Sequence, residues 1–216
     1  MSVDSVLDVV YLAAGLLVGL VIHEYAHALV ALRLGDHTPR QAGRLTLDPR
    51  PHVDPFGTLL LPAILLLPVL FGRAVFLIFA YAKPQPLNPW NLKKPENNAV
   101  AIALAGPAAN VIVAFGLGGL LRAGVSGELG RLLADALIVN VTLAAMNLVP
   151  LPPLDGARVV ARFISGRARE VYTSWDQYAA LFILVIFFIF NGPIFAFVKA
   201  VGNGICQMTA GGQCFF

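Results

Sequence analysis

The chain has 216 residues, of which 58% are hydrophobic and only 12% are charged, with a formal net charge of +3. Its mean hydropathy is +0.77. These values exclude an ordinary soluble domain, and scattered basic residues without interleaved aromatics exclude a nucleic-acid-binding surface. The composition predicts a polytopic protein of the lipid bilayer. With no internal repeat or long linker, we expect one domain over residues 1–216.

Four long apolar runs each approach the roughly 20 residues that a helix needs to cross the hydrocarbon. They cover residues 9–34, 98–121, 132–149 and 178–200. The first run has acidic residues ahead of it and no small-residue cleavage site, so we expect a retained span, not a signal peptide. The predicted fold class is an α-helical polytopic membrane protein with about four transmembrane helices.

The first apolar run contains three ionisable residues, in the sequence His23-Glu24-Tyr25-Ala26-His27. Helical spacing puts both histidines one turn apart on one face, where two imidazoles can bind one Zn²⁺ ion while Glu24 activates a bound water. Ionisable groups at membrane depth are costly and indicate a functional site by default. The alternative is a structural polar cluster between helices. The motif therefore predicts a metal centre below the membrane surface.

Two proline-rich stretches follow, at residues 43–55 and 83–90. Proline disfavours a helix, and the apolar residues of the first stretch alternate around Leu45 and Leu47, so we expect a small membrane-surface β segment. An edge at residues 43–47 would bind an extended substrate by strand addition. His52 and Asp54 are either polar contacts or metal ligands at the site mouth, or turn-forming residues, which is the commoner use. His37 is expected in a loop.

The apolar stretch 56–81 is interrupted by prolines and by Gly72 and Arg73, so it is either a bent span or a re-entrant hairpin. A full crossing would divide the basic residues evenly between the two sides. A hairpin would leave only Arg122, Arg131 and Lys199 opposite the other twelve of the fifteen Lys and Arg residues, which obeys the positive-inside rule. We therefore predict a hairpin, with the active site toward the cytoplasmic side. The N-terminus and the tail with Cys206 and Cys214 would then lie outside.

A catalytic zinc site usually has three protein ligands and leaves a fourth position to water. Asp155 is the candidate third ligand, because prolines end the preceding helix and Gly156 permits a tight turn. The predicted topology puts Asp155 on the same side as the end of the first span. From the residues alone, an equally good reading makes Asp155 the N-cap of a helix over Ala157–Ile164.

Three motifs in this order resemble the site-2 proteases, which are intramembrane zinc metalloproteases of the M50 type. They are His23–His27 (HEYAH), Ala105–Asn110 (AGPAAN) and Asn147–Gly156 (NLVPLPPLDG). The resemblance implies that His23, His27 and Asp155 bind one zinc ion, that Glu24 is the general base, and that Asn110 helps hold or polarise the scissile peptide. It also implies that the helices carrying the first two motifs are antiparallel. The chain is similar to the small prokaryotic branch that lacks PDZ and CBS modules.

The resemblance implies a metalloendopeptidase of a prokaryotic cell membrane. Its substrates would be membrane proteins cleaved within or near a transmembrane segment, as in regulated intramembrane proteolysis. Without the resemblance, Asn110 is better read as an interhelical hydrogen-bonding residue. The ionisable cluster also fits a membrane metal-ion or proton transporter, but such transporters usually have internal symmetry and several broken helices, which this sequence lacks. Histidine and carboxylate ligands also accept other divalent ions.

Overall fold

The structure is a computed structural model that describes residues 3–71, 80–175 and 191–212. These residues form helices and connecting segments, and none of them lies in a strand. The elements are α1 (Val3–Arg33), α2 (Thr38–Gln41), η1 (Pro55–Leu60), α3 (Leu61–Leu66), η2 (Leu67–Phe71), η3 (Pro89–Asn91), α4 (Pro95–Arg122), α5 (Gly127–Asn147), α6 (Asp155–Ala161), α7 (Gly166–Ser174) and α9 (Asn191–Thr209).

Three of the described helices, α1, α4 and α5, are long and apolar enough to cross a membrane. They contain most of the first three predicted spans. The fourth predicted span, 178–200, falls largely outside the described residues. Its described part, 191–200, belongs to α9. The structure therefore supports an all-helical membrane protein, and the number of spans stays a prediction.

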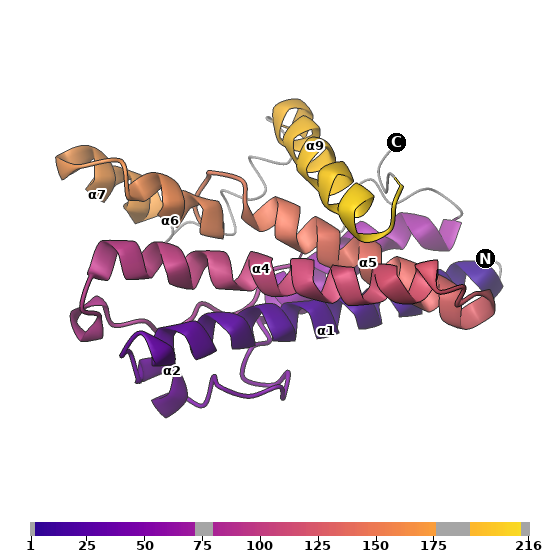
Figure 1. Cartoon of the computed structure of the whole chain (residues 1–216), viewed down its shortest axis with the longest axis horizontal. Helices are drawn as coiled ribbons and strands as arrows, with labels where there is room; N and C mark the ends of the chain where they lie inside the picture. Colours follow the sequence, from indigo (N-terminus) through magenta and orange to yellow (C-terminus); the bar gives the residue numbers. More distant parts are fainter. Residues whose placement is uncertain (1–2, 72–79, 176–190, 213–216) are drawn as a thin grey trace.

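The relative directions of the three long helices follow from the hydrogen bonds between them. Figure 1 shows how these helices are arranged. Asn110 of α4 bonds Gly19 of α1, whereas Ile102, earlier in α4, bonds His27, later in α1. These two helices are therefore antiparallel, as predicted. Arg131, near the start of α5, bonds the first turns of α1, so α5 runs parallel to α1. The ends of α1 and α5 and the start of α4 consequently lie at the same end of the bundle.

Small residues allow α1 to approach α5 closely. A Cβ at Gly15 would lie 3.1 Å from the Cα of Ala136, and a Cβ at Gly19 would lie 3.0 Å from the side chain of Leu143. In lipid, close packing and interhelical hydrogen bonds hold helices together, because the hydrophobic effect between helices is absent there. This contact packs the helix that carries both histidines directly against α5.

The stretch between α1 and α4 leaves the bundle end and returns to it. η1, α3 and η2 form one continuous helical arm over residues 55–71, and the chain is next described as an irregular segment, 80–88. The Tyr81 N–H donates to the carbonyl of Gly57 at 3.1 Å, and the Thr58 hydroxyl donates to the carbonyl of Tyr81 at 2.9 Å. The two ends of the predicted hairpin therefore meet, whereas a full crossing would separate them.

The predicted β segment is wrong for the described residues. Residues 42–52 form turns and bends, and segment 80–88 has no strand partner. A main-chain bond does run from Lys83 to His52, but the buried guanidinium of Arg44 donates to the carbonyls of Lys83 and Pro84. Because prolines lack the N–H groups that a ladder requires, side-chain bonds join the two stretches instead. Strand addition at residues 43–47 therefore has no strand to extend.

Candidate metal centre

Two histidines on one face of α1 form the first half of the site. His23 and His27 are both buried, and their ring centroids lie 4.6 Å apart with the planes at 81°. The four-residue spacing produces this arrangement because residues i and i+4 of a helix lie one above the other. The edge-to-face rings turn both Nε2 atoms toward the same point.

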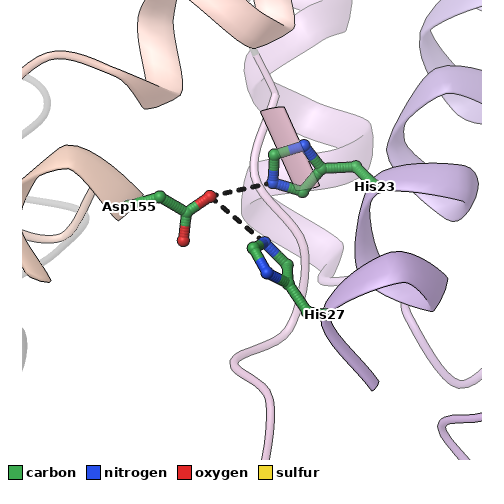
Figure 2. A group of neighbouring side chains, drawn as sticks. All are labelled: His23, His27 and Asp155. Atoms are coloured by element: carbon green, nitrogen blue, oxygen red, sulfur yellow. Dashed lines mark hydrogen bonds and ion pairs between the residues drawn. The ribbon is translucent and has the colours of Figure 1, made fainter. Parts of the chain in front are cut away.

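Asp155, the first residue of α6, brings the third side chain to that point (Figure 2). Its Oδ2 lies 3.0 Å from the Nε2 of His23 and 3.1 Å from the Nε2 of His27. The N-cap position of α6 is Leu154, and Asp155 points to the imidazoles, so the N-cap interpretation is wrong. The structure thus brings together the three residues that the sequence singled out as candidate ligands.

The structure requires glycine at position 156 for close packing, and not for the predicted tight turn. The glycines with a positive φ among the described residues do not include it, so a tight turn does not require it. A Cβ at Gly156 would instead lie closer than 3.0 Å to the carbonyl oxygens of Leu148 and Val149. The missing side chain lets α6 start directly against the end of α5, which carries Asp155 to the histidines.

The other ring nitrogen of each histidine bonds an acceptor. The Nδ1 of His23 lies 2.6 Å from the Oδ1 of Asn110, and the Nδ1 of His27 lies 2.6 Å from the carbonyl oxygen of Ile102. Both oxygens can only accept, so each of these bonds uses an N–H on Nδ1. The Asp155 carboxylate beside each Nε2 also only accepts, so a lone pair on Nε2 is the form that a cation between the three side chains would require. In that form each Nε2 would direct a lone pair to the space that it shares with Asp155. This tautomer and orientation are typical of metal-binding histidines.

Two imidazole lone pairs and one carboxylate oxygen thus converge, which is the donor set that a divalent cation prefers. Tetrahedral zinc with bonds of about 2.0–2.1 Å places its ligand atoms about 3.3 Å apart. The Asp155 oxygen lies 3.0 and 3.1 Å from the two nitrogens, close to this value, and all three ligand atoms lie within 4.8 Å of one another. A Cβ at Gly106 of α4 would lie closer than 3.0 Å to both Nε2 atoms, so the neighbouring helix also leaves room at this point. The residues fit a metal ion.

Asn110 differs from its expected role. Its amide nitrogen donates to the carbonyl of Gly19 at 3.0 Å and to the Oδ1 of Asn140 at 2.9 Å, while its oxygen faces His23. The residue is fully buried and does not line the cavity at the site. Both amide hydrogens are already donated, so none is left for a substrate carbonyl. In this structure Asn110 positions His23, and its expected contact with the scissile peptide stays a prediction.

A cavity of about 160 Å³ opens beside the three convergent side chains. Glu24 lines it, as do Gln85 of segment 80–88 and Arg158 of α6. The side-chain amide of Gln85 donates to the main-chain carbonyl of Glu24 at 2.9 Å, which attaches the segment to α1. Neither Gln85 nor Arg158 is among the site residues predicted from the sequence. A signal existed only for Arg158, which follows Asp155 at the i+3 spacing of a shared helix face.

The remaining candidates lie away from this cavity. His52 is buried, its Nε2 lies 3.0 Å from the carbonyl of Thr46, and its own carbonyl accepts the N–H of Lys83. Asp54 accepts from the N–H groups of Phe56 and Gly57 and so caps η1. Both residues therefore organise turns, in agreement with the commoner interpretation. His37 precedes the short helix α2 in a loop, and Cys214 lies outside the described residues.

Sequence comparisons connect this geometry to known proteins. Peptidase family M50 matches residues 122–191. The Bacillus subtilis protein named "Putative zinc metalloprotease YwhC" is 36% identical over 187 residues, which are 82% of this chain and 80% of that protein. "Putative zinc metalloprotease Rip2" of Mycobacterium tuberculosis is 31% identical over 82% of this chain and 66% of its own length. No solved structure matches. The chain therefore belongs to peptidase family M50.

Proposed function

We propose that the protein is an intramembrane zinc metalloprotease that hydrolyses peptide bonds within or near transmembrane segments of membrane-protein substrates. The observation that carries this proposal is the convergence of His23, His27 and Asp155 beside Glu24, between helices long enough to span a membrane. Family membership supports peptide hydrolysis as the chemistry. Membership of this family does not favour the alternative, a metal-ion or proton transporter.

We assign the three convergent residues as ligands of one zinc ion per chain. The relatives named as zinc metalloproteases support zinc over other divalent ions. When bound, zinc supplies Lewis acidity, which makes water more acidic and a carbonyl more electrophilic. Asn110 and the Ile102 carbonyl hold the imidazoles in the tautomer and orientation that such binding needs.

Glu24 is the proposed general base. It follows His23 directly on α1 and lines the cavity, so a substrate carbonyl in the cavity lies within its reach. The attacking water oxygen bonds to the carbonyl carbon while Glu24 takes a water proton. Glu24 then returns this proton to the amide nitrogen as the C–N bond breaks. The products are a carboxylate on one fragment and an amine on the other.

The depth of the site supports a substrate in the membrane. His27 is six residues before the end of α1 at Arg33, a distance of about 9 Å along the helix. A transmembrane substrate hides its carbonyls in helical hydrogen bonds, so it must unwind locally before attack. We propose that this happens at the cytoplasmic side of a prokaryotic cell membrane, where the basic residues collect.

The decisive experiment compares purified wild type with Glu24→Gln and Asp155→Asn. Bound zinc is measured by elemental analysis, and cleavage is measured on a single-span helical peptide in liposomes. We expect Glu24→Gln to retain zinc and lose cleavage, because the ligands stay intact while the base is gone. Asp155→Asn should lose both. Cleavage by Glu24→Gln at the wild-type rate would rule out the proposed mechanism.

The membrane location of cleavage needs its own comparison. The same scissile sequence is presented once in the single-span peptide and once in a soluble peptide without the apolar residues. We expect cleavage of the single-span peptide to be strongly preferred. Equal cleavage of both peptides would leave a metalloprotease but would refute the proposed intramembrane specificity.

A further inference from the structure

Arg158 is a cation at the wall of the catalytic cavity that the proposed chemistry has not yet used. It lies on α6 three residues after Asp155, and residues at this spacing share a helix face. The side chain is half-buried. Arg158 is therefore presented to the same space as the candidate metal ligand that precedes it.

Two neighbouring arginines have an acidic partner, whereas Arg158 has none among the described residues. Arg162 and Arg169 both form ion pairs with Glu96 at the start of α4. Across residues 3–71, 80–175 and 191–212, no carboxylate lies within ion-pair distance of the Arg158 guanidinium. A half-buried charge has lost part of its hydration, and without an ion-pair partner no attraction to an opposite charge offsets that loss. An oxygen of a substrate in the cavity would supply that partner.

The other polar side chains of the cavity wall are weaker donors. Apart from the candidate ligands and Glu24, they are Tyr81, Gln85 and Asn147. Gln85 and Asn147 each already donate to a main-chain carbonyl. Tyr81 has a neutral hydroxyl. Arg158 has five N–H groups and a fixed positive charge, and hydrogen bonds from an ionised donor are roughly twice as strong as neutral ones.

We propose that Arg158 is a further catalytic residue, which donates to the oxygen of the scissile carbonyl as negative charge develops there. This inference rests on the proposed function. When the water oxygen bonds to the carbonyl carbon, the π electron pair of the carbonyl moves to its oxygen. The guanidinium stays protonated and stabilises that charge until the C–N bond breaks and the pair returns. Arg158 thereby fills the role that Asn110, with both amide hydrogens donated, leaves open.

The test uses the full chain with Arg158→Met, Arg158→Lys and Arg158→Ala. Arg167→Met is the matched control, because Arg167 is exposed on α7 and does not line the cavity. We expect Arg158→Met to retain zinc and to lower kcat by on the order of 10²–10³, with a change in KM of less than about threefold, since the contact forms in the transition state. Added guanidinium should partly restore cleavage by Arg158→Ala. Arg167→Met should match wild type.

A binding measurement keeps the test independent of turnover. A fluorescent phosphinic peptide carries a negatively charged tetrahedral centre that resembles the transition state, and its affinity is read by fluorescence anisotropy. We expect the affinity to fall at least tenfold in Arg158→Met and to be unchanged in Arg167→Met. Arg158→Lys should be intermediate, because lysine retains the charge but lacks the planar fork.

Three results would overturn the role of Arg158 while the proposed protease stands. The first is a kcat of Arg158→Met equal to that of wild type. Another is loss of zinc in that variant, which would make Arg158 a support for the metal site. The third is a kcat loss in Tyr81→Phe that Arg158→Met does not share. Failure of the protease itself has a different signature, because wild type would then bind zinc and cleave neither peptide.

Discussion

Gly106 of α4 lies where the neighbouring helix comes closest to the two imidazoles. A Cβ at this position would lie closer than 3.0 Å to the Nε2 atoms of His23 and His27, which are the atoms that would bind the metal. A methyl group there would push the rings away from Asp155 or occupy the space of the ion. The glycine is therefore required by the space at the site and not by backbone conformation.

We predict that Gly106→Ala loses zinc. The zinc content per chain should fall at least tenfold after dialysis, although alanine is the better helix former by about 1 kcal/mol. Gly116→Ala is the control. Gly116 lies on the same helix, and a Cβ there would have no neighbouring atom within 4 Å. Elemental analysis and thermal unfolding of both variants make the comparison. Full zinc content in Gly106→Ala would show that the histidines do not bind the ion through Nε2.

Asp36 connects the end of α1 to the segment that leads into α4. Its buried carboxylate accepts from the main-chain N–H of Asn88 at 2.7 Å, from that of Thr38 at 3.0 Å and from the side chain of Asn91 at 2.9 Å. Burial alone would raise the pKa of Asp36, but the hydrogen bonds from Thr38, Asn91 and Asn88 outweigh it and lower the pKa. The ionised form is therefore the one that stabilises the fold.

This shift predicts a loss of stability in acid. Because the pKa of Asp36 is lower in the folded than in the unfolded chain, its contribution is fully present above the usual pKa of 3.8. The contribution is lost as the pH falls through the folded value. Asp36→Asn should lower the free energy of unfolding by about 1–3 kcal/mol at neutral pH and flatten its dependence on pH in acid. Glu170→Gln, an exposed change on α7, should do neither. Unfolding in detergent from pH 2 to 7 measures both, and parallel curves for Asp36→Asn and wild type would contradict the prediction.

The sequence predicted the elements whose pattern is local. His23 and His27 follow from helical spacing, and Asp155 follows from a helix that prolines end on the predicted side of the membrane. The β segment failed because a local pattern cannot reveal that the Arg44 side chain takes the carbonyls that a strand would use. The acceptors of the two histidine N–H groups depend on how α1 packs against α4. Only the folded arrangement shows that the Ile102 carbonyl is one of them.

Across the molecule, the directions of the helices agree with the distribution of charge. The ends of α1 and α5 and the start of α4 share one end of the bundle, and the irregular segments and short helices at that end carry most of the described basic residues. The turn at residues 123–126, between α4 and α5, lies at the other end, flanked by Arg122 and Arg131. By the positive-inside rule, we predict that the end with Asp155 faces the cytoplasm.

The re-entrant hairpin adds a testable condition to this topology. If the stretch 56–81 enters the membrane and returns, residues 43 and 93 lie on one side, whereas a full crossing would put them on opposite sides. We predict that green fluorescent protein fused after Gly43 or after Lys93 is fluorescent, and that alkaline phosphatase at these positions is inactive, because the hairpin topology would put both positions in the cytoplasm. Fusions after Val125 should show the reverse pattern. Opposite readings at Gly43 and Lys93 would refute the hairpin. The same reading at Lys93 and Val125 would mean that α4 does not span, and the metal centre would then lie outside the bilayer.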